Sequence, residues 1–182
     1  MPKSKSAYSI PGKIGKLERH IIVIWVDNEA GVLARVVGLF SGRGYNIESL
    51  TVSEVDSDKL LSRITIVTSG TQIIVNQIKA QLLKLIPVHD LIDLTQKKSY
   101  IAKELILIKL QSKKKYRKKT FEIMKKYNTN ILIDDNSELI MEMIGSTNEI
   151  SKFIEKVRPF GILELTRSGV VSMALGLDYI KK

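Results

Sequence analysis

Hydrophobic positions along this chain follow two spacings, and their alternation predicts strands and helices in a definite order. The apolar run from Ile21 to Val26 predicts a buried strand. The stretch from Glu29 to Ser41 repeats its apolar positions at helical spacing and predicts an amphipathic helix. Two further apolar stretches, Tyr45 to Val55 and Leu60 to Thr68, are separated by a short polar turn and predict a hairpin.

A second helix and a fourth strand complete this unit. Ser69-Gly70-Thr71 opens a helix with one apolar side, and Pro87 ends it before a strand from Val88 to Leu94. The order βαββαβ then starts again about eighty residues later, a period that indicates a duplicated domain. The second copy is predicted as strands Leu105 to Leu110, Asn130 to Asp134, Leu139 to Ile144 and Ile162 to Thr166, with helices Lys113 to Tyr127 and Asn148 to Val157.

These segments predict an α+β protein of two tandem ferredoxin-like βαββαβ domains. Each domain should form a four-stranded antiparallel sheet with two helices on one face. We expect a flexible basic leader at residues 1–18, the first domain at 19–95, a short polar linker at 96–103 and the second domain at 104–182.

The junction between the first strand and the first helix carries the most distinctive chemistry. Asn28 is a strong N-cap residue and Glu29 supplies the negative charge favoured in a first turn, so the helix is expected to begin at Asn28. Unpaired N–H groups at a helix start attract anions, and Gly31 leaves room for a ligand to approach the backbone. Such a junction can hold a carboxylate, which points to a protein that senses an amino acid.

Composition limits the class of protein. With 182 residues and 44% hydrophobic content, the chain is typical of a globular protein with one ordinary domain or two small ones. No apolar run approaches the ~20 residues that span a bilayer, and the first residues lack the apolar core of a signal peptide. Lysine exceeds arginine and isoleucine is abundant, so we expect a bacterial cytoplasmic protein, with an organelle-encoded copy as the alternative.

The net charge of +10 is unevenly distributed. It is +4 over residues 1–20, zero over 21–102 and +6 over 103–182, so the part with the glycine junction is neutral. Much of the surplus lies in the leader and in the run Lys113 to Lys119. A run of this kind is most often a solvated helix face, and binding of an acidic partner is the alternative.

Residues with catalytic or metal-binding chemistry are scattered. Ser62 and Ser168 have no evident base, and the absence of cysteine excludes thiol nucleophiles and disulfides. His20 and His89 are isolated and lack the paired spacing of a metal site. We expect no catalytic residues, no metal and no active site in this chain.

Several stretches together resemble one protein family. Asp27 to Arg35, Gly38 to Ser41 and Arg43 to Val52 resemble the small regulatory subunit of acetohydroxyacid synthase, also called acetolactate synthase. The resemblance continues through Leu61 to Val67 and reappears at Arg167 to Val170. The string Gly-Tyr-Asn-Ile-Glu-Ser-Leu-Thr-Val is specific to this subunit, whereas the Asn-x-x-Gly-Val-Leu turn alone would indicate only some ACT domain.

The resemblance implies a mode of ligand binding. The N-terminal domain would be an ACT domain that forms a homodimer by joining two sheets side by side, with a feedback amino acid, usually valine, bound at the seam between them. Two copies of the ligand would bind symmetrically. The matching effector-binding residues would be Asn28, Gly31, Val32 and Leu33 of one subunit, with Asn46 and Ile47 from its partner.

The resemblance also implies a partner and a reaction. The chain would activate the catalytic (large) subunit and confer feedback inhibition by a branched-chain amino acid in branched-chain amino-acid biosynthesis. The thiamine diphosphate, Mg²⁺ and FAD of that reaction would belong to the catalytic subunit, and this chain would hold no cofactor of its own.

A basic RRM-like RNA-binding protein is the alternative, because the RRM is also a βαββαβ fold. RRMs stack bases on aromatic side chains of the third strand, and Leu60 to Val67 contains none. Arg43-Gly44-Tyr45 resembles the start of an RNP1 motif, but Asn46 breaks that pattern. We expect neither a nucleic acid nor a membrane as partner.

Overall fold

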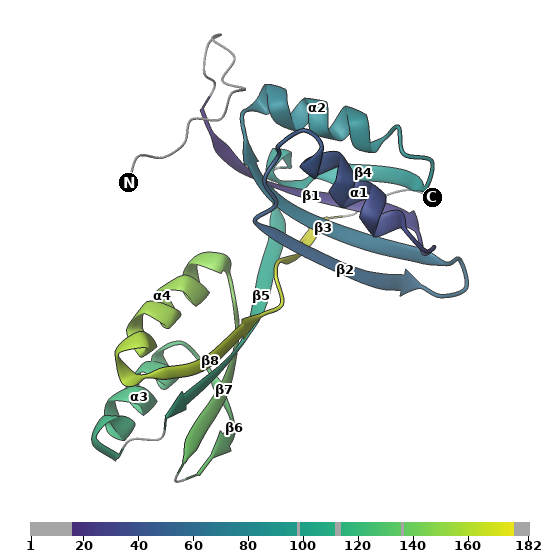
Figure 1. The fold of residues 1–182 in the computed structure, drawn as a ribbon. Coiled ribbons are helices and arrows are strands. Elements are labelled where there is room, and N and C mark those ends of the chain that lie inside the picture. Colours follow the sequence, from purple (N-terminus) through teal and green to yellow (C-terminus); the bar gives the residue numbers. More distant parts are fainter. Residues whose placement is uncertain (1–15, 98, 112–113, 136, 177–182) are drawn as a thin grey trace.

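The computed structural model describes residues 16–97, 99–111, 114–135 and 137–176, and repeats the order βαββαβ twice (Figure 1). This order confirms the predicted α+β class with two ferredoxin-like units. Most of the expected basic leader, and Lys113 in the lysine run, lie outside the described residues. Within the described residues, no helix has the length and apolar composition that crossing a bilayer requires.

The first domain is an antiparallel sheet with two helices on one face. Its strands lie in the order β2-β3-β1-β4, so β2 and β4 are the edges. The strands are β1 (Glu18–Asp27), β2 (Ser49–Asp56), β3 (Leu61–Gly70) and β4 (Val88–Asp93), and the helices are α1 (Val32–Ser41) and α2 (Gln72–Leu82). A short 3₁₀ turn, η1 (Leu94–Gln96), follows β4.

The central position of β1 in the sheet explains why its sequence is apolar without alternation. Ile22 and Ile24 face α1 and α2 and have no exposed surface. Ile21 and Val23 point to the opposite face and are also buried, in a separate cluster. A strand buried on both faces reads as a continuous apolar run. The opposite face of this sheet must therefore be covered by another part of the chain.

The second domain repeats the arrangement of an antiparallel sheet with two helices. Its principal strand order is β6-β7-β5-β8. Its elements are β5 (Tyr100–Gln111), α3 (Lys114–Lys126), β6 (Asn130–Asp134), β7 (Glu138–Gly145), α4 (Thr147–Val157), η2 (Arg158–Phe160), β8 (Ile162–Arg167) and β9 (Val171–Ala174). Helix α4 begins with a capping box in which the side chains of Ser146 and Glu149 each accept from the other's backbone N–H.

The two domains are joined by a two-stranded ribbon that sequence analysis missed. Residues 100–103 of β5 pair with β9, and from Glu104 onward β5 pairs with the second sheet. We call residues 100–103 with 171–174 the crossing ribbon. It packs on the first sheet opposite its helices, where Ala102 and Ala174 lie against the cluster of Ile21, Val23 and the adjacent Val170 (Figure 1). The stretch 96–103, expected to be a linker, therefore contains the start of a strand.

The start of β2 also differs from the prediction. The strand was expected from Tyr45 but begins at Ser49. Gly44 has a left-handed backbone with φ of 68°, and the Tyr45 ring packs edge-on against Phe40 at 6.2 Å between centroids. These contacts turn Tyr45 inward toward α1, and the chain reaches the sheet edge four residues later.

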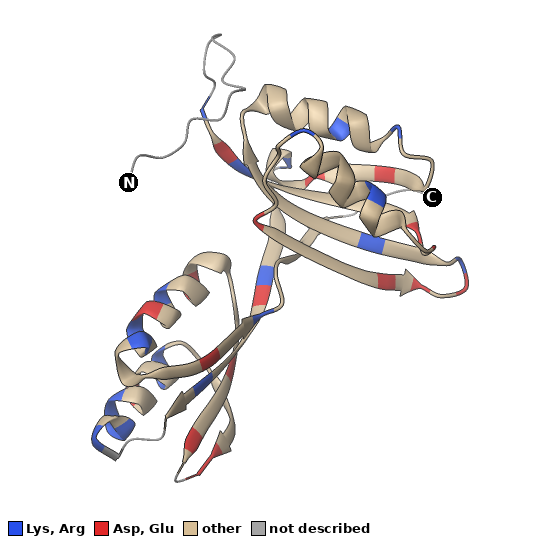
Figure 2. Cartoon of the chain, in the orientation of Figure 1, with Lys and Arg blue, Asp and Glu red and all other residues tan. Residues whose placement is uncertain are grey.

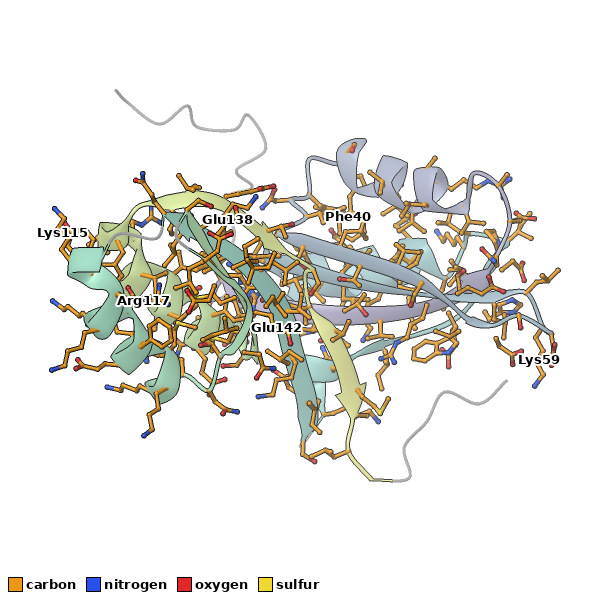
Figure 3. The ribbon with its side chains drawn as sticks, turned by 90° about the horizontal axis from the view of Figure 1, so that it is seen from below. Phe40, Lys59, Lys115, Arg117, Glu138 and Glu142 are labelled. Atoms are coloured by element: carbon orange, nitrogen blue, oxygen red, sulfur yellow. The ribbon has the colours of Figure 1, made fainter. Side chains whose placement is uncertain are left out.

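We expect Phe40→Ala to lower the free energy of unfolding of the first domain by about 3–5 kcal/mol, the usual cost of removing a buried aromatic ring. Phe40 is 1% exposed and lies between the helix layer and the sheet (Figure 3). Trp25 is the single tryptophan, so denaturant unfolding followed by its fluorescence reports on this domain. The control is Ile86→Ala at a side chain 96% exposed, which should change stability by less than about 0.5 kcal/mol.

Candidate functional site

The turn into α1 is built around Gly31. Its φ of 86° lies in the left-handed region, and its carbonyl accepts the first helical hydrogen bond, from the N–H of Arg35 at 3.0 Å. The helix begins at Val32, and no side chain caps it. The expectation that Asn28 is the N-cap is therefore wrong, because a left-handed residue cannot lie inside a helix. Glu29 lies before the first turn and pairs with Arg35 instead.

This turn leaves backbone donors open. The N–H groups of Gly31 and Leu33 donate to no described residue, and that of Val32 makes a long bond of 3.4 Å to the carbonyl of Glu29. A Cβ built on Gly31 would meet no atom within 4 Å, so the turn is open on the Cβ side of Gly31, next to these donors. Open donors at the positive end of a helix are suited to a carboxylate.

The side chains around this turn have different roles. Asn28 is exposed, its N–H donates to the carbonyl of Leu60 at 2.6 Å, and its amide group bonds to no described residue. Val32 is 4% exposed and belongs to the core, so only its backbone faces the turn. Leu33 is 40% exposed and is the apolar side chain available beside the open donors.

The second group of predicted site residues precedes β2. Asn46 is exposed and lies in the loop before the strand, not at its start as expected. Its carbonyl accepts a hydrogen bond from Oγ1 of Thr68 at 2.6 Å, and its side chain makes no bond to a described residue. Ile47 is half-buried and packs against the core beneath the helices.

The two groups of residues are far apart within one chain. Strands β1 and β2 both pair antiparallel with β3, so they run in the same direction. Asn28 follows the last residue of β1 and Asn46 precedes the first residue of β2, which places them at opposite ends of the sheet. A single chain therefore does not bring Asn28 and Asn46 into one pocket.

Glu48, next to Asn46 and Ile47, makes a polar connection that sequence analysis missed. Its carboxylate accepts a hydrogen bond from Ser69 and another from Nε of Arg19 at 2.9 Å. The bond from Ser69 contributes most, and together with the charge of Arg19 it holds the pKa of Glu48 below its ordinary value of 4.5, against the opposing effect of partial burial.

The same arginine reaches the second domain. Nη1 of Arg19 lies 3.4 Å from Oγ1 of Thr147, the first residue of α4. Thr147 donates to Glu104, which is 3% exposed and also accepts from Nε of Arg167 at 2.9 Å. These groups line a cavity of about 810 Å³ between the two domains.

Both histidines form pairs within the first domain. His20 is 3% exposed, and its Nδ1 lies 2.9 Å from Asp93 Oδ2 and 3.1 Å from Thr95 Oγ1. His89 lies 2.6 Å from Asp27 through Nε2. Each histidine thus links β1 to the fourth strand or to the turn after it, and no group of three metal-ligating side chains occurs among the described residues.

The lysine-rich helix α3 lies at the end of the molecule far from the first domain (Figure 2). Lys115, Lys118 and Lys119 are exposed, and Lys115 projects outward (Figure 3), whereas Arg117 pairs with Asp134 of β6. The opposite side of the helix packs into the second core through Tyr116. The described part of the run therefore fits the predicted solvated helix face.

The structure gives the RNA-binding alternative no support. An RRM stacks bases on the open face of its sheet. In this chain the corresponding face of the first sheet is packed against the crossing ribbon, and Val67 of β3 is buried there.

A ferredoxin-like sheet with an open glycine turn between its first strand and first helix is the arrangement of an ACT domain. The chain matches the family described as "AHAS small subunit-like ACT domain" over residues 22–90. The family described as "Small subunit of acetolactate synthase" matches residues 103–176.

Relatives match across both domains. A probable acetolactate synthase small subunit of Archaeoglobus fulgidus is 39% identical, over 87% of this chain and 98% of the relative. The small subunit of acetolactate synthase isozyme 3 of Escherichia coli is 36% identical, over 87% and 96%. The crystal structure of the acetolactate synthase small subunit of Thermotoga maritima superposes with a TM-score of 0.80 at 27% identity, over 87% and 98%. This chain belongs to the family of acetolactate synthase small subunits.

We expect the stabilising effect of Glu48 to depend on pH. Because the folded pKa is lowered, the stability that Glu48 adds is complete above pH 4.5 and is lost as the pH falls through the folded pKa. The difference in free energy of unfolding between the wild type and Glu48→Gln should therefore shrink in acid, as measured by urea unfolding at several pH values.

Glu54→Gln is the matched control, because Glu54 lies on β2, the strand that Glu48 directly precedes, and makes no ion pair with a described residue. A Glu54→Gln profile of the same shape would contradict the role assigned to Ser69 and Arg19.

Proposed function

We propose that this regulatory subunit binds a branched-chain amino acid, valine, at the turn into α1 and thereby inhibits its catalytic partner. The observation that carries the proposal is the set of open N–H groups at Gly31 and Leu33, beside a glycine whose Cβ position is open space. An amino-acid effector supplies the carboxylate that such donors accept.

The surrounding side chains support the remaining contacts of the ligand. The carbonyl oxygen of the exposed Asn28 amide can accept a hydrogen bond from the ligand's ammonium group. Leu33 offers exposed apolar surface to an aliphatic side chain. A zwitterion with a short branched side chain satisfies all three groups, whereas a larger polar amino acid would leave its side chain against Leu33.

Pairing of two subunits along β2 would complete the site. β2 is an edge strand, and a two-fold axis through its middle would pair the two copies antiparallel. This operation carries the partner's residues before Ser49 to the end of β2 that leads to Leu60. Leu60 accepts from Asn28, so Asn46 and Ile47 of one subunit would approach Asn28 of the other.

The catalytic chemistry belongs, in this proposal, to the large subunit, which would hold thiamine diphosphate, Mg²⁺ and FAD. This chain contributes a change in the partner's activity that depends on the effector. Such coupling requires the effector to favour one arrangement of the complex, typically by ~1–3 kcal/mol of differential binding.

Gly31→Asp should abolish valine inhibition of the reconstituted synthase while leaving its activation by this subunit in place. The added carboxylate would occupy the empty space at Gly31 and repel the carboxylate of the ligand. Activity assays with increasing valine measure both effects.

The control is Gly161→Asp, because Gly161 also has a left-handed backbone, with φ of 89°, and open space around its Cβ position, but lies in the other domain. Undiminished valine inhibition in Gly31→Asp would refute the site.

Sharing of the site across two subunits predicts complementation. Asn28→Ala and Asn46→Ala should each lose valine binding, yet a mixed dimer of the two variants has one intact site and one that lacks both groups. Calorimetric titration of the exchanged mixture should recover binding at about half of the mixed-dimer sites. Absence of recovery, with subunit exchange demonstrated by mass, would show that Asn28 and Asn46 do not form one site shared between two subunits.

A further inference from the structure

The turn between β8 and β9 is held tightly against the edge strand of the first domain. The N–H of Val170 donates to Oγ of Ser49 at 3.1 Å, and Oγ1 of Thr51 donates to the carbonyl of Ser168 at 3.3 Å. Val170 itself is 1% exposed and lies in the core beneath the first sheet. Two hydrogen bonds and a buried side chain thus fix this turn on β2.

Gly169 is required by this contact. Its φ is 79°, and a Cβ at this position would stand 2.7 Å from Oγ of Ser49 and 2.8 Å from Oγ1 of Thr51. Both separations are shorter than real contacts of a Cβ atom. Any other residue would have to displace the turn from β2 or rotate the hydroxyl groups of Ser49 and Thr51 away, and either change breaks the two hydrogen bonds.

The turn is equally fixed to the second domain. The N–H of Ser168 donates to the carbonyl of Leu105 at 2.9 Å, and Oγ of Ser168 accepts from the N–H of Leu105 at 3.0 Å. The adjacent Arg167 pairs with the buried Glu104. Residues 167–170 therefore bind β2 on one side and β5 on the other, and we name them the clamp.

The clamp meets the first domain three residues beyond Asn46. Between them, the N–H of Glu48 bonds to the carbonyl of Val67 at 2.8 Å, and Glu48 reaches Thr147 of the second domain through Arg19. Ser49 and Glu48 are thus the first residues after this loop that reach the second domain, Ser49 directly and Glu48 through Arg19.

We propose that the clamp couples effector binding to the position of the second domain, with Gly169 as its positioning residue. This inference rests on the proposed function, since it assumes that an effector engages Asn46. The ligand changes the loop before β2, and the clamp converts that change into a shift of the second domain. Removal of the clamp leaves the effector bound but without consequence for the catalytic partner.

The test is Gly169→Ala, compared with Gly161→Ala. Gly161 has a φ of 89°, and its added Cβ would meet nothing within 4 Å, so both variants place alanine at a left-handed φ and only one carries the clash. Valine affinity is measured by calorimetry on the full chain, and valine inhibition on the reconstituted synthase. We expect Gly169→Ala to bind valine within about threefold of wild type and to need about tenfold more valine for half inhibition.

A second variant, Ser49→Ala, removes the acceptor of the Val170 N–H without adding bulk and should weaken inhibition in the same direction. Unchanged inhibition in Gly169→Ala, or an equal loss in Gly161→Ala, would overturn the clamp.

Amide hydrogen exchange separates this inference from the proposed function. Gly169→Ala should accelerate exchange at Val170 and along β9 relative to Gly161→Ala, with the amides of β3 unchanged as evidence of folding. Equal exchange in the two variants would overturn the clamp whether or not valine binds. A wild-type chain that binds no branched-chain amino acid overturns the proposed function and the coupling with it, while faster exchange would still show that Gly169 holds the domains together.

Discussion

The architecture of this subunit depends on burying both faces of the first sheet. The central strand β1 carries apolar residues toward its helices and toward the opposite face, and each set needs its own cover. α1 and α2 cover one side, and the crossing ribbon covers the other. Because the second cover is made from β5 and β9, the first domain has no complete core without the chain of the second. The stability of the first ferredoxin-like unit therefore depends on the second.

Much of the fold could be predicted from the sequence, because periodicity is local information. The apolar run of β1, the helical spacing of α1 and the repeat of βαββαβ are all found in the structure. The crossing ribbon could not be predicted in this way. β9 has four residues, and the part of β5 that pairs with it lies some seventy residues earlier in the chain. Segments this short show no periodicity that would identify them as strands.

The candidate site was predicted in its position but not in its geometry. Asn28 and Glu29 obey the preferences of a helix start, yet the left-handed Gly31 moves that start to Val32 and leaves Asn28 free. The string around Glu48 and Ser49 is distinctive of the family, but the hydrophobic pattern offers no physical reason for it. The structure supplies one, since both residues contact the second domain, directly or through Arg19. Such contacts can be predicted only when it is known which distant segments of the chain lie together.

The continuity of β5 has a mechanical consequence. One strand of twelve residues, about 40 Å long, serves the ribbon at one end and the second sheet at the other. β5 continues without a break from the crossing ribbon into the second sheet. The second domain is therefore attached rigidly to the segment of β5 that lies under the first sheet. A rotation of the ribbon would therefore be transmitted along β5 and would displace the lysine-rich helix α3 at the far end of the molecule (Figure 2).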